Sequence, residues 1–348
     1  MMNKPKVMAL IVLSALVLSL FAGSYFTKAK AVDLSSKISL TVKMPQNFTA
    51  SDKDRVLIDI YKIADAEPVS GYDTYSLTLL DAYKSLDLTK TNKTGSTDWE
   101  TISADAANIA LKKGALQTPD VKGVALETAE DLTTVGPGLF LVVAHGTDSD
   151  YIRYPEKEGD LIETIASGEK VYYHFNPQLI CIPDRFDEAT GTSNTANNNI
   201  PWQYDAVLNL KASVEQKLGD VQIVKKLIAP EGVQVKPCTV IFNVVGVFNG
   251  QTVYEKEHAI NFNGNSSDSI LIKDLPCDTI VTVTEVYPGA GYAPTNPSTG
   301  VLVGTIGPET TITLSFENTL KTRIFGVGII NHFEYKNSEW QLTTPDKD

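Results

Sequence analysis

Three segments in the second half of the chain alternate apolar and polar residues, and each contains a lysine, an acid or an amide within the pattern. The segments are Val-Gln-Ile-Val-Lys (221–225), Val-Thr-Val-Thr-Glu (281–285) and Phe-Glu-Asn-Thr (316–319). Alternation with a period of two residues is typical of β-strands that bury one face. Because successive side chains point to opposite faces, Lys225 rather than Lys226 faces the core, and Glu285 shares the apolar face of its strand. The sequence therefore predicts a lysine and a glutamate inside one β domain, with Asn318 in its closing strand.

The N-terminus has the pattern of a secretory signal peptide. Two lysines precede an apolar run over residues 7–22, and Ala-Lys-Ala at 29–31 provides a small-x-small cleavage site. We expect cleavage before Val32, so that residues 1–31 contribute nothing to the mature fold. A retained membrane anchor is the alternative, but the run is short for a bilayer span. We predict a secreted or cell-surface protein without a transmembrane span after cleavage.

The charge of the mature chain argues against nucleic-acid partners. The formal net charge is −12 for the whole sequence, and residues 1–31 contain four lysines and no acid, so cleavage changes it to −16. Phosphate backbones are bound by clustered Lys and Arg, which so acidic a chain does not favour. The 317 residues that remain of the 348 are long for a single hydrophobic core, so we predict two domains.

Strand signals dominate both predicted domains. Alternating and β-branched runs, separated by Gly, Pro and Asn turns, predict an all-β protein of two tandem β-sandwich domains. A stretch rich in Ala and Leu over residues 76–113 favours helix and is predicted as a helical insertion in the first domain. The expected boundaries are a first domain over 32–211, a linker over 212–220, a second domain over 221–322 and a C-terminal strand and tail over 323–348.

Both predicted domains carry motifs of a known family. Residues 221–320 resemble the collagen-adhesin B-type (prealbumin-like) repeats of Gram-positive pilins and adhesins, through Ile-Val-Lys-Lys (223–226), Leu-Pro-Cys-Asp-Thr-Ile-Val-Thr-Val-Thr-Glu (275–285), Pro-Gly-Ala-Gly-Tyr (288–292) and Phe-Glu-Asn-Thr (316–319). Residues 34–211 are similar to the N-terminal domain of sortase-assembled major pilins, through segments 58–65, 136–143 and 202–211. The resemblance implies immunoglobulin-like or prealbumin-like sandwiches in a structural protein of the bacterial surface.

The resemblance also implies an intramolecular isopeptide bond between Lys225 and Asn318, with Glu285 as the catalytic acid. Burial disfavours the charged forms of an amine and of a carboxyl group, so a neutral lysine and a protonated glutamate are expected here. Glu285 would polarise the Asn318 carboxamide and shuttle protons while Lys225 attacks and ammonia leaves. Asn331 is an alternative acceptor. In the alternative without a bond, Lys225 reaches solvent, Glu285 is at the surface and Asn318 is a turn residue.

Other lysines could take part in further covalent links, within the first domain or to another subunit. In the first domain Lys43 or Lys62 could pair with Asn209, but no Val-Thr-Glu follows Gly138, so the acid of the family pattern is missing. Lys211 falls where major pilins carry the lysine of a Tyr-Pro-Lys-Asn motif, which a sortase joins to another subunit. Its flanks here are Asn-Leu-Lys-Ala. Lys211 is therefore either a sortase-linked lysine or a solvated linker residue.

Three cysteines in an exported chain allow one disulfide. Cys238 and Cys277 both begin apolar runs of the second domain, which predicts a disulfide between them. Cys181 lies in an apolar segment and is expected to be a small buried hydrophobic residue.

The sequence lacks the common motifs of enzymes and metal sites. Its four histidines have no metal-ligand spacing, and it contains no Gly-x-Ser-x-Gly, phosphate-loop or dinucleotide glycine pattern. Paired carboxylates for glycoside hydrolysis have no fixed spacing and stay an alternative. We predict that the protein is not an enzyme and has no metal and no cofactor.

The predicted function is that of a secreted cell-surface structural protein, a pilin-like or ancillary pilus subunit stabilised by the isopeptide bond. Its expected partners are other pilus or cell-wall proteins, joined by a sortase, and a host or glycan ligand is an open further partner. The sequence has no Leu-Pro-x-Thr-Gly-like sorting signal, so noncovalent retention, addition at a polymer terminus and truncation are all open. The alternatives are a glycan- or host-matrix-binding adhesin that does not polymerise and a non-catalytic module of a secreted enzyme system.

Overall fold

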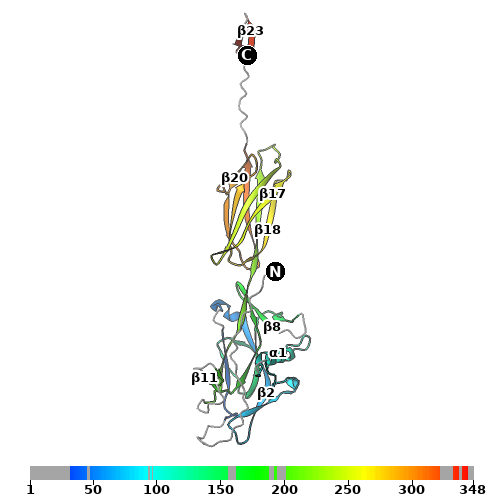
Figure 1. Ribbon diagram of the computed structural model, residues 1–348, viewed down its shortest axis with the longest axis vertical. Coiled ribbons are helices and arrows are strands. Elements are labelled where there is room, and N and C mark those ends of the chain that lie inside the picture. Colours follow the sequence, from blue (N-terminus) through cyan, green and yellow to red (C-terminus); the bar gives the residue numbers. More distant parts are fainter. Residues whose placement is uncertain are drawn as a thin grey trace. The chain divides into compact units, whose positions relative to one another are not determined.

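The computed structural model describes residues 32–44, 48–92, 95, 97–155, 162–187, 192–193, 201–321, 332–336 and 339–343. The chain is all-β and divides into two compact units, Met1–Lys217 (unit 1) and Leu218–Asp348 (unit 2) (Figure 1). The predicted signal peptide and Asn331 lie outside the described residues. No helix in the described part of the chain is long and apolar enough to cross a membrane.

The strands of unit 1 form three main sheets. The first has the order β13 (Asp205–Asn209), β1 (Ser39–Lys43), β5 (Ala129–Asp131). The second has the order β10 (Gln178–Ile182), β6 (Gly138–Gly146), β2 (Val56–Pro68), β3 (Tyr75–Leu79), with β4 (Val121–Ala125) also paired to β2. The third has the order β14 (Ala212–Gln216), β9 (Val171–Phe175), β8 (Glu163–Ser167), β7 (Ile152–Arg153). A small pair is made by β11 (Phe186–Asp187) and β12 (Thr192–Ser193).

Strand β6 lies at the centre of unit 1 because it is apolar along its length and buried on both faces. Phe140 on one face belongs to a core shared with β1 and β9. Leu141 on the other face belongs to a core that includes Ile102 of helix α1 (Trp99–Ala110). Asp98 caps this helix, since its side chain accepts a hydrogen bond from the backbone N–H of Thr101. The short 3-10 helices are η1 (Ala50–Arg55) and η2 (Asp81–Tyr83).

Two sequence predictions about unit 1 need correction. The stretch 76–113 was expected to be helical, but its first part is strand β3, because Tyr-Ser-Leu-Thr-Leu alternates and pairs with β2. Helix is confined to η2 and α1 within this stretch. The predicted linker 212–220 is mostly strand, since β14 pairs with β9 and the next strand begins at Leu218. Unit 1 therefore continues to Lys217.

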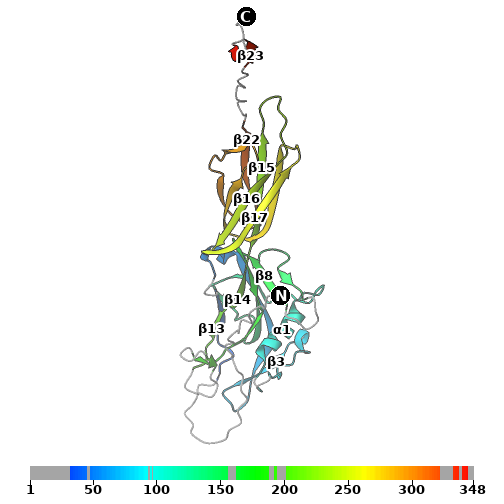
Figure 2. The same ribbon diagram turned by 45° about the horizontal axis from the view of Figure 1, so that its top comes forward.

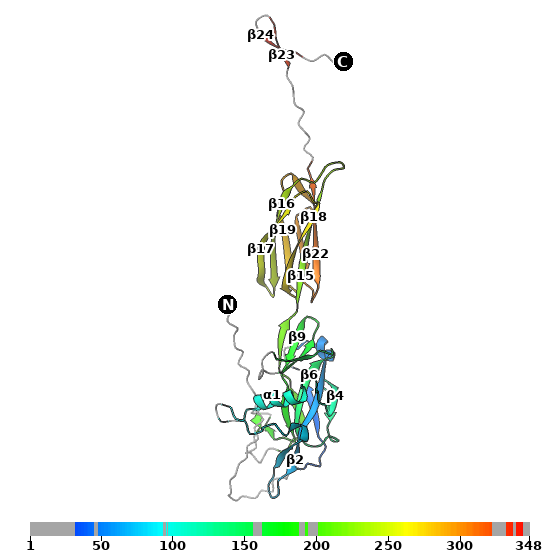
Figure 3. The ribbon, with the colours of Figure 1, turned by 90° about the vertical axis from the view of Figure 1, so that its right-hand side faces the viewer.

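Unit 2 is a sandwich of two four-stranded sheets (Figures 2 and 3). One sheet has the order β18 (Ser267–Pro276), β15 (Leu218–Ile228), β22 (Thr311–Leu320), β20 (Tyr292–Asn296). The other has the order β17 (Gln251–Phe262), β16 (Cys238–Phe248), β19 (Ile280–Tyr287), β21 (Val301–Thr305). In the described part of the C-terminal segment, β23 (His332–Lys336) pairs with β24 (Glu339–Thr343) and not with the sandwich.

The first and last strands of this sandwich, β15 and β22, are parallel neighbours. Their register places Lys225 opposite Phe316 and Leu227 opposite Asn318. Alternate residues of β15 are buried, so Lys225 and not Lys226 faces the core, as the alternation predicts. Two residues that are far apart in the sequence, Lys225 and Asn318, thus become diagonal neighbours on the buried face of one sheet.

Candidate isopeptide site

Three polar side chains meet inside unit 2. Lys225 comes from β15 and Asn318 from β22 of one sheet, whereas Glu285 comes from β19 of the facing sheet. The side chains of Lys225 and Glu285 are 0% exposed, and Asn318 is also fully buried. An apolar core accepts such groups only when they are paired with one another, because each loses its hydration on burial.

One oxygen of Glu285 contacts both of the other residues. Glu285 Oε1 lies 2.7 Å from Lys225 Nζ and accepts a hydrogen bond from Asn318 Nδ2 at 2.8 Å. Asn318 Nδ2 also donates to the carbonyl oxygen of Pro288 at 2.9 Å. The two acceptors fix the carboxamide with its nitrogen towards the acid. The amine and the amide nitrogen are thereby held against the same carboxylate oxygen.

The surroundings of Lys225 favour its neutral amine. Its Nζ lies 6.0 Å from the ring centroid of Phe242 and 5.9 Å from that of Phe316. Burial lowers the pKa of the Lys225 amine, and the hydrogen bond and charge of Glu285 oppose this shift without cancelling it. A larger fraction of the amine is therefore unprotonated at neutral pH, which is the form that acts as a nucleophile.

Before any reaction, this arrangement leaves buried polar atoms without partners. Glu285 Oε2 and Asn318 Oδ1 have no hydrogen-bond partner among the described residues. An unsatisfied buried polar atom costs about 1–3 kcal/mol, and a buried ion pair offsets its own desolvation only in part. Joining Lys225 to Asn318 through an amide removes the lysine charge from the core. The covalent product is therefore better suited to this environment than the unlinked side chains.

The geometry fits amide formation by nucleophilic attack. Proton transfer from Lys225 Nζ to Glu285 gives a neutral amine and a carboxylic acid. The amine would then attack Cγ of Asn318, the acid would protonate Nδ2, the Cγ–Nδ2 bond would break and ammonia would leave. The attacking nitrogen would pass its surplus proton back to the Glu285 carboxylate. Because Glu285 faces Nδ2 rather than Oδ1, its direct role in such a reaction would be to protonate the leaving nitrogen. One C–N bond forms as another breaks, and Glu285 is not consumed.

Two contributors to the site escape sequence reasoning. The carbonyl of Pro288 orients the Asn318 amide, and a backbone group gives no signal in a residue pattern. Phe242 lies opposite Glu285 in the pairing of β16 with β19, and the alternation of its strand was the available signal for its burial.

No group of three or more His, Cys, Asp or Glu in the described ranges is arranged to hold a metal ion.

The other lysines of interest lie outside this site. Lys211 is exposed between β13 and β14 of unit 1. Lys43 and Asn209 are opposite each other on the parallel strands β1 and β13, but both are exposed. Lys62 is buried, and its Nζ donates to the carbonyl oxygen of Val135 at 2.6 Å. Neither Lys43 nor Lys62 is paired with a buried acid among the described residues, in contrast to Lys225.

The predicted disulfide between Cys238 and Cys277 is wrong, because the register of β16 and β19 keeps the two residues far apart. Cys238 begins β16, whereas Val247 near the end of β16 is the residue opposite Ile280. Nine strand positions at about 3.3 Å each separate Cys238 from Val247, and Cys277 closely precedes Ile280. The two thiols thus lie near opposite ends of the strands, and a disulfide requires Cα atoms within about 7 Å. Cys181 is buried, as predicted, and burial raises the pKa of its thiol to about 12.

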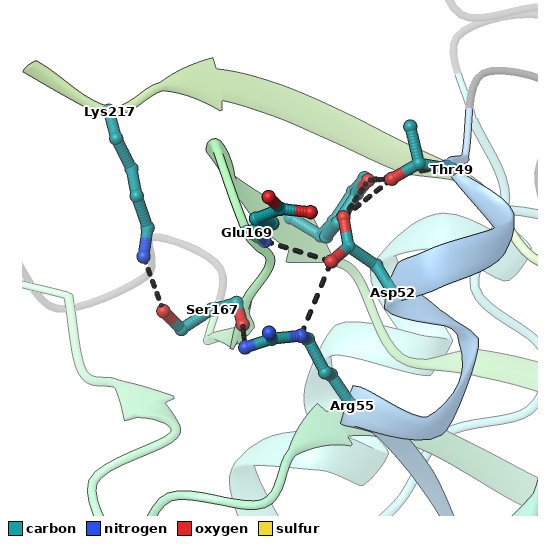
Figure 4. A network of polar contacts seen from close by, with 7 residues as sticks. Thr49, Asp52, Arg55, Ser167, Glu169 and Lys217 are labelled. Atoms are coloured by element: carbon teal, nitrogen blue, oxygen red, sulfur yellow. Dashed lines mark hydrogen bonds and ion pairs between the residues drawn. The ribbon is translucent and has the colours of Figure 1, made fainter. Parts of the chain in front are cut away.

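A second buried polar cluster, in unit 1, is not evident from the sequence (Figure 4). Asp52 of η1 is 1% exposed and accepts hydrogen bonds from the Thr49 hydroxyl at 2.6 Å, the Glu169 backbone N–H at 2.8 Å and the Tyr173 hydroxyl at 2.9 Å. Arg55 Nε lies 3.3 Å from its carboxylate. Burial opposes ionisation of Asp52, but these hydrogen bonds and the Arg55 charge outweigh it and lower the pKa. The hydrogen bonds of Asp52 therefore hold η1 against the turn between β8 and β9.

No family model and no curated protein matches the sequence. Several solved structures that resemble the chain are pilins and adhesins. The minor pilin GBS52 of the Gram-positive pathogen Streptococcus agalactiae shares 14% identity over 82% of this chain and 97% of its own, with a TM-score of 0.24. A C-terminal fragment of the pilus adhesin SpaC from Lactobacillus rhamnosus GG shares 11% identity over 82% of this chain and 99% of its own, with a TM-score of 0.24.

A third similar structure is an adhesin from Mobiluncus mulieris that contains intramolecular disulfide, isopeptide and ester bond cross-links. It shares 11% identity over 53% of this chain and 78% of its own, with a TM-score of 0.28. At such identities and TM-scores these likenesses carry no inference about chemistry or partners. The function of this chain is therefore inferred from the side chains of its site.

Proposed function

We propose that this chain is a secreted structural protein of a bacterial surface, a pilin-like or ancillary pilus subunit locked by an isopeptide bond between Lys225 and Asn318. The observation that carries the proposal is the contact of one buried Glu285 oxygen with both Lys225 Nζ and Asn318 Nδ2. These three groups supply the nucleophile, the proton carrier and the electrophile of one self-contained reaction. The reaction calls for neither a cofactor nor an external substrate.

The position of the bond suits a protein that carries load along its chain. Unit 2 begins with β15 at Leu218, and its sandwich ends with β22 at Leu320. Because these strands are parallel neighbours, a pull on the two ends of the sandwich shears one strand against the other. An amide between Lys225 and Asn318 passes that force directly from β15 to β22. The intervening residues are then protected from extension, and the strands resist separation covalently.

The proposed partners are neighbouring pilus or cell-wall subunits. Lys211 is exposed between β13 and β14, where an enzyme can reach a side chain more readily than in a strand core. It stays the candidate for a lysine that a sortase would join to a partner.

The intact mass of the mature protein tests the proposed bond. We expect a mass lower than the sequence mass by one ammonia, and we expect Lys225→Met and Glu285→Ala to restore the full mass. Lys226→Met is the matched control, because Lys226 is the exposed neighbour on the same strand, and this variant should keep the loss. A wild-type protein of full mass, or a loss that persists in Lys225→Met, would reject the bond.

A further inference from the structure

The loop between β2 and β3 holds a carboxylate that contacts the first described residue of the chain. Asp73 Oδ1 accepts a hydrogen bond from the backbone nitrogen of Val32 at 2.7 Å and another from Trp202 Nε1 at 3.0 Å. Its second oxygen, Oδ2, is paired with the guanidinium of Arg185. Asp73 therefore joins three segments that are far apart in the sequence, and one of them is the N-terminal segment at Val32.

Neighbouring contacts fix the position of Val32. The backbone N–H of Asp33 donates to the Tyr204 hydroxyl at 2.8 Å, and the backbone N–H of Ser39 donates to the Tyr204 carbonyl oxygen at 3.0 Å. The Asp33 side chain in turn accepts hydrogen bonds from the residues that follow it, including the Ser35 backbone N–H at 3.0 Å. The segment before β1 is thus held at several points. The nitrogen of Val32 meets Asp73 as part of an ordered arrangement.

The carboxylate is itself held in place. The Asp73 side chain is 18% exposed and that of Arg185 is 5% exposed. The Arg185 guanidinium lies 4.4 Å from the Trp202 ring centroid, and the Trp202 ring is 5.6 Å from that of Tyr75. Little rearrangement is therefore needed for Asp73 to receive a cation. Shielding from water also strengthens any charge pair at this position.

We propose that Asp73 is the binding site for the α-ammonium group that signal-peptide cleavage creates at Val32. In the precursor the Val32 nitrogen is an uncharged amide, which donates one hydrogen bond. After cleavage the same atom is an ammonium, and its bond to the Asp73 carboxylate becomes charge-assisted at both ends. Because the ionised carboxylate is the acceptor in both forms, the gain on cleavage is the Coulomb attraction of the added positive charge. The chemical event of processing and the stability of unit 1 are thereby coupled.

Cleavage raises the stability of unit 1. The precursor lacks the ion pair, so its unit 1 is less stable than that of the mature protein, which suits a chain that has to cross a membrane before it folds. The mature chain gains the pair at the moment that cleavage occurs. This inference rests on the proposed export and on cleavage before Val32.

A comparison of N-termini tests the contact while every side chain stays intact. One protein comprises residues 32–348 with a free Val32 amine, and the other carries a four-residue Gly-Ser extension. The extension moves the ammonium by up to about 13 Å, beyond the Debye length of about 8 Å at physiological salt. Unfolding by urea is followed by tryptophan fluorescence. Trp99 and Trp202 lie in unit 1, whereas Trp340 belongs to unit 2 and is the same in both proteins. We expect the unfolding equilibrium of unit 1 to be about tenfold more favourable in the extended protein.

Variants identify the partner of the ammonium. Asp73→Asn should abolish the difference between the two N-termini, even though the loss of a partner for Arg185 lowers the stability of both proteins. Asp131→Asn is the matched control, because Asp131 is an exposed acid of unit 1 that accepts the Thr133 backbone N–H at 2.8 Å. In Asp131→Asn the tenfold difference should persist. Equal stability of the two N-termini, or a difference that survives Asp73→Asn, overturns the inference.

N-terminal sequencing of the protein recovered from an exporting host separates this inference from the proposed function. A start at Val32 supports both the inference and the proposed export. A start elsewhere rejects the processing step on which the inference depends, whereas the intact-mass test of the isopeptide bond is unaffected. A start at Val32 together with equal stabilities rejects the ion pair alone.

Discussion

Replacing Asn318 by leucine removes the electrophile of the proposed bond while nearly preserving the size of the side chain. Lys225 and Asn318 are 93 positions apart, and a cross-link that closes a loop of about 100 residues stabilises by about 4.7 kcal/mol in the chain-entropy model. The variant also loses the single N–H that the proposed amide keeps, which leaves one buried acceptor without a donor at about 1–3 kcal/mol. Burial of the leucine side chain offsets about 1.5–3 kcal/mol of this. We expect Asn318→Leu to lower the free energy of unfolding of unit 2 by about 5 kcal/mol.

Scanning calorimetry of the full mature chain measures this effect. A loss of 5 kcal/mol corresponds to a fall of more than about 20 °C in the melting temperature of a domain of this size. The transition of unit 1 should not move. Asn243→Leu is the control, since Asn243 is a half-buried residue of β16 without a role in the proposed reaction, and it should shift the transition by only a few degrees. A melting temperature for Asn318→Leu within a few degrees of wild type would refute the cross-link as the source of stability.

Two further predictions concern unit 1 and the cysteines. Hydrogen bonds and Arg55 lower the folded-state pKa of Asp52, so its contribution is present above the ordinary value of 3.8 and is lost as the pH falls through the folded value. Asp52→Asn should therefore destabilise unit 1 by about 2–4 kcal/mol at pH 7, with a smaller effect near pH 3 in urea denaturation, and a pH-independent difference would contradict this. Alkylation of the unfolded, unreduced protein should modify all three cysteines, whereas recovery of a peptide that links Cys238 to Cys277 would reverse our correction.

The alternation of the sequence predicts the site better than it predicts the strands around it. Lys225 and Glu285 lie within apolar runs of period two, so their burial follows from the pattern alone. Strand β17 has a weak signal in the sequence because its exposed face carries charged residues such as Glu255 and Lys256, which makes an edge strand look like a loop. Strands β20 and β21 are short and bounded by Gly and Pro, and only their pairing with β22 and β19 defines them.

The features that the sequence does not predict depend on how residues that are far apart in the chain are placed in space. The pairing of Cys238 with Cys277 was inferred from similar local contexts, but the register of β16 and β19 separates them along the strands. The contact between Val32 and Asp73 joins a terminal segment to a loop, and no periodic pattern marks either partner. Residue patterns report which face of an element is buried. They do not report which ends of different elements meet.

The most direct test of the account is tandem mass spectrometry of a proteolytic digest of the mature wild-type protein. We predict a branched peptide in which the Lys225 side chain is joined to the Asn318 side chain with the loss of one ammonia. The same peptide should be absent from Glu285→Ala. Recovery of Lys225 and Asn318 only in separate, unmodified peptides, or of Lys225 joined to Asn331, would contradict the assignment made here.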